Sequence, residues 1–440
     1  MRGVRPDCGR PDFFRNFNNG VIMNREKSNE IYKWVLLGLL WVAYFLQQGT
    51  RQIYNAVIPQ IQSDFGVDSV HIGLVATVFT FTYGICVPLA GIASDIFRRK
   101  WVIVIGVGLF SLGIFFSSFA SSIGILLITY GLLNGMGQSF YFPPASSLMG
   151  QLHSERRSTA FSIHQTAQYL GVVICSCVAG YLGMLKPVAG FSGWQLPFLL
   201  FGGIGIVWAL ILAFTMRYSR LTPPTVSREE IRKSFKEASL MMVRKPSALI
   251  LSLAFGFMVY VDIGFKTWMP TYLFETYGMS IGEAAFNAVI WHYAGAFLGV
   301  MVGSRVIDRL VMRKIHTARF DADIAGFFFA APFIYLMANA SGLPMCILAL
   351  FLFGVFKGVC DAGIFASFLD VIVPQYRASA MGIMLCVGFV IGSTASTVLG
   401  FMRDHLGLTA GISSLALLYF VNAAMIFAAR KFFFRRDYEG

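Results

Sequence analysis

Apolar runs long enough to cross a membrane recur along the whole chain, and they limit its fold more than any other feature. A membrane-spanning helix needs about 20 predominantly apolar residues. Twelve runs meet this requirement, and short polar or charged segments separate most of them. They predict an all-α membrane protein of twelve transmembrane helices, with approximate limits 33–58, 70–91, 101–120, 123–149, 158–182, 194–216, 247–273, 284–304, 322–339, 344–369, 378–402 and 409–433.

The composition agrees with this assignment. Of the 440 residues, 56% are hydrophobic and only 13% are charged, whereas about a quarter of the residues of a soluble domain carry charge. This argues against a soluble enzyme, a disordered protein and a secreted disulfide scaffold. The seven cysteines are odd in number, and all but Cys8 lie inside apolar runs. We interpret them as small buried apolar residues rather than as disulfide partners or metal ligands.

The basic residues predict an orientation in the membrane. Most of the 35 lysines and arginines lie in the N-terminal segment, in the loops after even-numbered spans, and at the C-terminus. Loops on the opposite side carry only Lys186 and Arg403. The positive-inside rule therefore predicts that both termini are cytoplasmic. We expect the protein to lie in the inner (plasma) membrane of a bacterium. The net charge of +13 is a topology signal, and we expect no nucleic-acid partner. The residues before the first run do not resemble a cleavable signal peptide.

An internal repeat predicts two halves. Arg157-Ser158-Thr159-Ala160 follows the fourth span, and Arg377-Ala378-Ser379-Ala380 follows the tenth. Asp95 after the second span is echoed by Asp308 after the eighth. The predicted parts are a cytoplasmic segment 1–32, a six-helix bundle 33–216, a cytoplasmic linker 217–246, a second six-helix bundle 247–433 and a tail 434–440.

The loop after the second span carries a family resemblance. Gly91, Asp95 and the basic run Arg98-Arg99-Lys100 resemble the loop motif of the major facilitator superfamily, although Ile96 and Arg98 depart from it. The resemblance implies two pseudo-symmetric bundles, alternating access, a monomer and no cofactor. It also implies that the loop forms a latch between conformations; the alternative is that its basic residues only set topology. The predicted gating residues are Gly91, Asp95, Arg98, Arg99, Asp308 and Arg377.

Two segments resemble particular branches of that superfamily. The stretch from Arg51 to Pro59 and the stretch from Trp268 to Leu273 are similar to helices 1 and 7 of organophosphate:phosphate antiporters and anion:cation symporters. The resemblance implies that Arg51 binds the anionic group of a substrate. Other cationic positions of the phosphate antiporters are not matched, so a carboxylate fits better than a phosphate.

Charged residues inside the spans indicate the same chemistry, because such residues are costly in a membrane and usually functional. Asp262 and Lys266 are four residues apart, as are Lys357 and Asp361, so each pair can neutralise itself on one helix face. Arg51 has no charged neighbour within a turn. The excess positive charge predicts an anionic substrate. The alternatives are that Arg51 pairs with Asp262 or Asp361 on another helix, and that both i, i+4 pairs are structural bridges.

Polar and aromatic residues on the same spans extend the candidate site. They could bind the hydroxyl groups of a sugar-like body, or they could only join helices by hydrogen bonds. The predicted substrate-binding residues are Arg51, Tyr54, Asn55, Asn134, Gln138, Tyr141, His164, Gln168, Lys266, Trp268 and Lys357.

The sequence predicts a secondary active transporter. It would move a small organic anion, either a carboxylate such as a sugar acid or a phosphorylated anion, with a proton as the coupling ion. Asp262 and Asp361 are the predicted proton-coupling residues, with Asp262 favoured. The alternatives are a proton-coupled polyspecific or drug exporter and a transporter-like solute sensor. We expect no enzyme activity and no metal site, since the sequence contains neither a catalytic motif nor paired Cys/His ligand spacing.

Overall fold

The computed structural model describes residues 12–153, 157–188, 190–216 and 228–438, and the described chain is almost entirely helical. The first half contains α1 (Asp12–Ala56), α2 (Ile58–Phe65), α3 (Ser69–Ile96), α4 (Arg99–Ser117), α5 (Ile123–Leu126), the π-helical η1 (Leu127–Asn134), α6 (Gly135–Ser139), α7 (Phe142–Leu152), α8 (Arg157–Gly183) and α9 (Gln195–Thr215). After α10 (Arg228–Arg244), the second half contains α11 (Pro246–Tyr277), α12 (Ile281–Met312), α13 (Ala318–Ala338), α14 (Leu343–Asp370), η2 (Pro374–Tyr376), α15 (Arg377–Ser393), α16 (Ala395–Leu406), α17 (Leu408–Phe432) and α18 (Phe434–Asp437).

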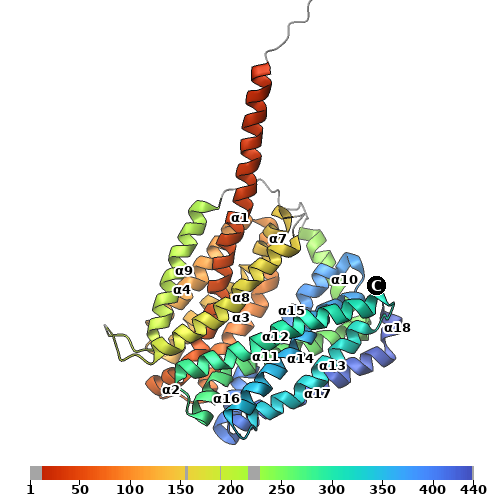
Figure 1. The fold of residues 1–440 in the computed structure, drawn as a ribbon. Coiled ribbons are helices and arrows are strands. Elements are labelled where there is room, and N and C mark those ends of the chain that lie inside the picture. Colours follow the sequence, from red (N-terminus) through yellow and green to blue (C-terminus); the bar gives the residue numbers. More distant parts are fainter. Residues whose placement is uncertain (1–11, 154–156, 189, 217–227, 439–440) are drawn as a thin grey trace, which may run out of the picture.

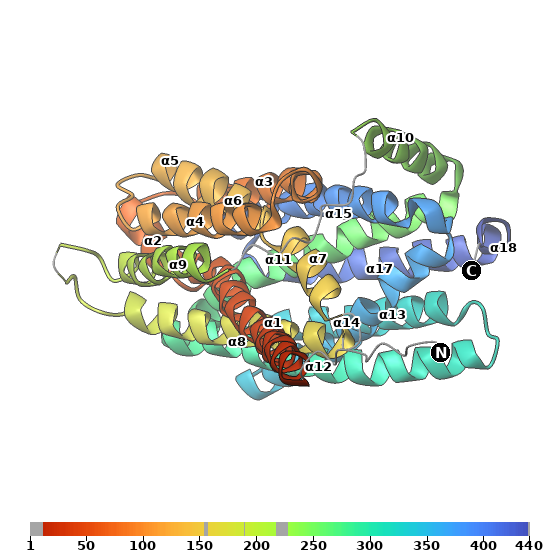
Figure 2. The same ribbon diagram turned by 90° about the horizontal axis from the view of Figure 1, so that it is seen from above.

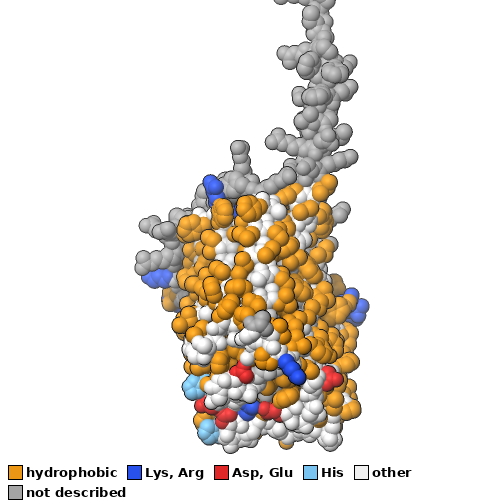
Figure 3. Space-filling model, turned by 90° about the vertical axis from the view of Figure 1, so that its left-hand side faces the viewer, with side chains coloured by type: hydrophobic (Ala, Val, Ile, Leu, Met, Phe, Trp, Pro, Cys, Tyr) orange, Lys and Arg blue, Asp and Glu red, His pale blue; other side chains and the backbone are white. Residues whose placement is uncertain are grey.

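The predicted membrane-spanning helices are present. Within the described residues, 11 helical segments are long and apolar enough to cross a membrane, and the first predicted span lies in the last part of α1. The fold of twelve transmembrane helices in two bundles is therefore confirmed. Apolar side chains cover the face of the molecule that would meet lipid (Figure 3), and large ones such as Phe214 and Phe432 are 86% and 68% exposed.

Several spans are broken, for reasons that the sequence explains. Pro59 lies in the first turn of α2, where its missing N–H is tolerated after the chain leaves α1. The fourth span is divided into α5, η1, α6 and α7, and prolines lie at the start of α7. Gly113 of α4 packs against this π-helical stretch, since a Cβ at Gly113 would lie 2.7 Å from the Asn134 nitrogen. A larger residue there would push the two helices apart.

The helix ends carry recognisable caps. Asp68 precedes α3 and accepts a hydrogen bond from the His71 backbone N–H at 2.9 Å. This bond, with a second one from the His71 ring, lowers the pKa of the Asp68 carboxyl. Ser280 and Glu283 form a capping box at the start of α12, which satisfies two backbone N–H groups reciprocally.

The two halves meet along two pairs of helices. α3 lies beside α15 and α16, and α8 lies beside α12 (Figures 1 and 2). Gly73 of α3 allows the backbone of Ser396 to come into contact with it, as small residues do where membrane helices approach closely. Figure 1 shows the halves converging at α2 and α16.

A polar network closes this end of the molecule. Arg403 Nη1 donates to Gln62 Oε1 at 2.7 Å and to Ser69 Oγ at 2.5 Å. The Ser69 backbone N–H donates to Asp404 Oδ2 at 2.9 Å, so a carboxylate of the second half caps the N-terminus of α3 in the first, where the helix dipole favours an anion. We call these four residues, Gln62, Ser69, Arg403 and Asp404, the closed end.

Substitution of Arg403 should loosen the closed end. Arg403→Ala removes two charge-assisted hydrogen bonds between the halves, each contributing about 1.5–3 kcal/mol. We expect about a tenfold or greater rise in the rate at which a cysteine at Thr80, inside the cavity, reacts with a bulky thiol reagent applied to this side. Lys186→Ala, which removes an exposed cation of the first half, is the matched control. Equal labelling rates in the two variants would contradict a gating role for Arg403.

Candidate functional site

A cavity of about 420 Å³ lies between the two halves, within the range of roughly 300–1,000 Å³ that small-molecule sites occupy. Helices α1, α3, η1, α7 and α8 line it from the first half, and α11, α12, α14 and α15 from the second. Its polar and charged lining consists of Tyr44, Gln48, Arg51, Gln52, Asn55, Thr80, Tyr83, Tyr130, Gln168, Asp262, Lys266, Thr267, Tyr293, Lys357 and Asp361.

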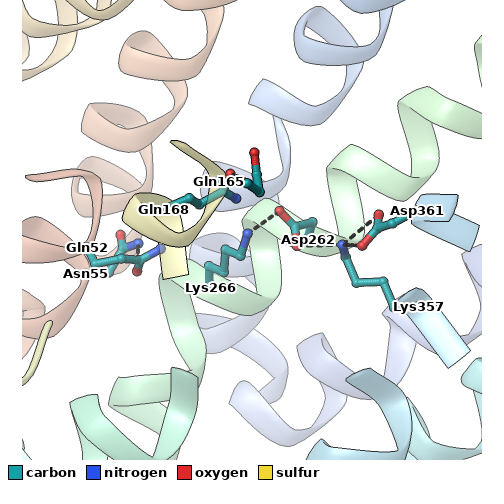
Figure 4. A network of polar contacts seen from close by, with 8 residues as sticks. All are labelled: Gln52, Asn55, Gln165, Gln168, Asp262, Lys266, Lys357 and Asp361. Carbon is teal, nitrogen blue, oxygen red and sulfur yellow. Dashed lines mark hydrogen bonds and ion pairs between the residues drawn. The ribbon is translucent and has the colours of Figure 1, made fainter. Parts of the chain in front are cut away.

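Four charged side chains form a row on the second-half wall. Lys266 Nζ lies 2.7 Å from Asp262 Oδ2, and Lys357 Nζ lies 2.8 Å from Asp361 Oδ2. These are the two i, i+4 pairs expected from the sequence. Lys357 also lies 3.5 Å from Asp262 Oδ1, a contact between α14 and α11 that spacing alone does not predict. The result is an alternating row of two lysines and two carboxylates with no net charge (Figure 4).

Arg51 faces this row from the first half. Its Nε donates to Gln138 Oε1 at 2.6 Å, while its Nη2 is buried without a hydrogen-bond acceptor. The guanidinium carbon lies 4.4 Å from the centre of the Tyr83 ring, close enough for a cation–π interaction. No carboxylate of the described chain forms an ion pair with Arg51. The excess positive charge of the cavity therefore belongs to Arg51.

The Arg51 side chain is held from behind by a buried amide cluster. Gln138 Nε2 donates to Asn134 Oδ1 at 2.9 Å and to Thr50 Oγ1 at 3.2 Å. Gln47 Nε2 donates to the Gln138 backbone oxygen at 2.6 Å. Because Gln138 is fixed in this way, its Oε1 holds the guanidinium in one orientation at the cavity wall.

The structure brings part of the predicted substrate-binding set to the cavity. The predicted residues that line it are Arg51, Asn55, Gln168, Lys266 and Lys357, together with the predicted coupling residues Asp262 and Asp361. The others are almost fully buried and do not line it: Tyr54, Asn134, Gln138, Tyr141, His164 and Trp268.

Those buried side chains have protein partners instead. Tyr54 donates to the Ile72 backbone oxygen at 2.7 Å, and Trp268 Nε1 donates to the Ser396 oxygen at 2.9 Å. The Tyr141 hydroxyl lies 3.0 Å from His164 Nε2, and the Tyr44 ring stacks on His164 with centroids 4.3 Å apart. Tyr44 is thus the residue that faces the cavity, and His164 lies behind it. In this conformation these side chains contact neighbouring helices, as in the alternative that they only join helices by hydrogen bonds.

Several cavity residues were not among those predicted. Gln48 and Gln52 share the helix face of Arg51 and Asn55, and the i, i+3, i+4 spacing could have identified them. Tyr83 and Tyr293 lie on the second and eighth spans, where no charged or motif residue marks the site. Lys266 Nζ lies 5.2 Å from the centre of the Tyr293 ring, so this aromatic residue contacts a cation of the cavity.

The residues predicted for gating lie at the opposite end of the bundle from the closed end, at the end of α3, the start of α4, the end of α12 and the start of α15. Gly91 has open space around it, since a Cβ there would meet nothing within 4 Å. Arg377 Nε donates to the Ile372 oxygen of its own half at 3.2 Å. The side chain of Asp95 lies outside the described residues. The latch role of these residues stays a prediction.

Comparison with known proteins identifies the family. The family model of the Major Facilitator Superfamily matches residues 40–396. The chain belongs to this superfamily. The family resemblance expected from the loop after the second span is therefore confirmed.

Individual relatives within the superfamily are distant. The chain is 25% identical over 396 residues to protein spinster homolog 1 of Xenopus tropicalis, covering 84% of this chain and 72% of that protein. It is 25% identical over 425 residues to the probable galactarate/D-glucarate transporter GudP of Escherichia coli, covering 90% and 91%. A crystal structure of a bacterial homologue of the human lysosomal transporter Spinster, in an inward-facing and unoccupied conformation, matches with a TM-score of 0.81 and 20% identity over 93% of this chain and 99% of that one.

The charge row makes a prediction about stability for this superfamily member. Asp262 compensates two lysines, whereas Asp361 compensates one. Asp262→Asn leaves buried cations uncompensated and should destabilise the protein by about 3 kcal/mol or more, while Asp361→Asn should cost clearly less. Thermal unfolding of both variants in the same detergent checks this order. Equal melting temperatures would show that Lys357 does not depend on Asp262.

Proposed function

We propose that this protein is a secondary active transporter that carries a small organic anion by alternating access, with a proton as the coupling ion. The observation that carries the proposal is Arg51: a guanidinium at the cavity wall with a buried Nη2 that has no acceptor. An uncompensated cation inside a membrane protein is costly. An anionic ligand group would compensate it, and a guanidinium can bind a carboxylate through two parallel hydrogen bonds.

The shape and lining of the cavity support a small polar body attached to the anionic group. The amides of Gln48, Gln52 and Asn55 share the helix face of Arg51, and Gln168 of the neighbouring α8 also lines the cavity. Amides and tyrosine hydroxyls both donate and accept hydrogen bonds, which suits a polyhydroxylated acid. GudP is named for two such acids, galactarate and D-glucarate, so these are the first substrates to test.

The arrangement of the halves supports an inward-facing state. Hydrogen bonds within the described chain join α3 to α15 and α16, and they join α8 to the start of α12. These bonds lie toward the closed end. With the predicted topology, the closed end is on the outer side of the membrane. The cavity would then exchange substrate with the cytoplasm in this conformation, and transport would require the closed end to open while the opposite end closes.

Transport by purified protein tests the proposal directly. Proteoliposomes are loaded with unlabelled D-glucarate, and entry of labelled D-glucarate, a monocarboxylate sugar acid and a sugar phosphate is measured. Saturable exchange of an anion supports transport; binding without exchange would favour a solute sensor. Movement of hydrophobic cations but of no anion would favour an exporter and overturn the proposal.

Substitution of Arg51 should remove anion binding without unfolding the protein. We expect Arg51→Ala to weaken binding about tenfold to hundredfold, as loss of a charge-assisted hydrogen bond of about 1.5–3 kcal/mol implies. Arg51→Lys should recover part of this, because a point charge replaces a bidentate fork. The ligand-induced rise in melting temperature measures binding, and Lys186→Ala is the control for loss of a positive charge. Binding by Arg51→Ala at wild-type strength would sink the assignment.

The geometry moves our proposal for the coupling residue from Asp262 to Asp361. Two lysines contact Asp262, which favours its anionic form, whereas the ion pair of Asp361 in the described chain is with Lys357 alone. The Asp361 side chain is also more exposed, at 31% against 20% for Asp262. Asp361 can therefore exchange a proton with the cavity while Lys357 keeps a partner in Asp262. Uphill transport requires such a group, whose protonation differs between states.

The Asp361→Asn variant should lose proton-driven accumulation of substrate but keep substrate exchange. We expect it to lose accumulation of substrate driven by a pH gradient, since the proton site is gone, and to keep counterflow exchange at wild-type rates within about twofold. Asp262→Asn, compared at equal amounts of folded protein, should lose both, because the charge row collapses. If Asp361→Asn still accumulates substrate against its gradient, the proton binds elsewhere or another ion drives transport.

A further inference from the structure

A carboxyl group away from the central cavity is enclosed between α13 and α14. Asp323 is 0% exposed. Its Oδ2 accepts a hydrogen bond from the Ser367 hydroxyl at 2.5 Å, and its Oδ1 has no hydrogen-bond partner. Gly363 of α14 leaves the space that Oδ1 occupies, because a Cβ at Gly363 would collide with that oxygen.

The charged groups around Asp323 do not compensate it. On α14, Cys360 donates to the Asp323 backbone oxygen at 3.8 Å, and Asp370 pairs with Arg319. On the α17 side, Arg430 Nε lies 2.5 Å from Asp321 Oδ1, and the buried Tyr419 packs against Phe327. α12 contributes no hydrogen bond or ion pair to the carboxyl group in the described chain. Both nearby arginines are therefore committed to other carboxylates.

A charged carboxylate in this position would be an uncompensated ion in the interior, which is far more costly than a neutral acid with one hydrogen bond. We propose that Asp323 is a proton-binding site, separate from the transport cavity, that holds its proton in the conformation described here. This inference does not depend on the substrate or on the coupling role of Asp361.

The site is placed where a proton could bias the conformation. α14 presents Cys360, Gly363 and Ser367 toward Asp323, and Lys357 and Asp361 toward the cavity. Loss of the proton would put a negative charge against the α14 backbone, and water or a cation could reach it only if α13 and α14 separated. Such a movement would shift the charge row. A proton on Asp323 therefore favours the tightly packed state, since a ligand stabilises the state that binds it.

Infrared spectroscopy of the protein in lipid nanodiscs at neutral pH tests the site. A protonated carboxyl group has a C=O stretching band distinct from that of a carboxylate. We expect a band that Asp323→Asn removes and that Asp321→Asn retains, because Asp321 is ion-paired two residues away on the same helix. A wild-type spectrum that Asp323→Asn leaves unchanged would overturn the proposal.

The pH dependence of thermal unfolding gives a second measurement. A carboxyl group that binds its proton more firmly in the folded state than in the unfolded state stabilises the fold at low pH. This contribution to the free energy of unfolding is lost as pH rises through the pKa of the folded state. We expect this fall in the wild type and in Asp321→Asn, and its loss in Asp323→Asn. If Asp323→Asn does not fold, Ser367→Ala replaces it: removal of the hydrogen bond to the acid should shift the carboxyl band, and an unshifted band would contradict the assignment.

Discussion

Charge compensation in a medium without water is the constraint on which this structure depends. Of the five charged residues that line the cavity, four compensate one another in a single row: Lys266, Asp262, Lys357 and Asp361. The row joins α11 to α14 within the second half. Arg51 is left on the first half, where it rests on a buried amide and an aromatic ring. Those contacts orient the guanidinium, but they do not cancel its charge.

The positions of the four charged side chains depend on how closely the helices that carry them pack. α14 packs against α12 with backbone in contact with backbone, since added Cβ atoms at Gly295, Gly299, Gly354 and Gly358 would all collide with main-chain atoms of the facing helix. Close approach through small residues is how membrane helices gain packing contacts without a hydrophobic driving force between them. Gly354 and Gly358 flank Lys357, so the same contacts fix the height at which its ammonium group meets the two carboxylates.

The sequence predicted the fold well, because a bilayer permits few solutions for an apolar run of about 20 residues. It also predicted the charged residues of the cavity, since an ion in a span is conspicuous. Uncharged residues were harder to place: Gln138 and His164 share helix faces with polar neighbours, yet they lie behind Arg51 and Tyr44. Helical periodicity gives the direction of a side chain on its own helix, but not which neighbouring helix covers it. Asp323 was missed for the same reason, because only the packing of α13 on α14 shows that it lacks a cation.

Under the proposed function, the net charge of the cavity also relates the charge of the substrate to the number of protons carried with it. The residues that line the cavity carry one excess positive charge, on Arg51. A monocarboxylate would make it neutral without any proton. A dicarboxylate would leave one negative charge, and a proton on Asp361 would remove it. Because a charged cavity is costly to enclose when both ends are shut, each further negative charge on the substrate calls for one further proton. A site of this kind would couple protons to dianions more tightly than to monoanions. The difference would arise from total charge alone, without a specific contact to the second carboxylate.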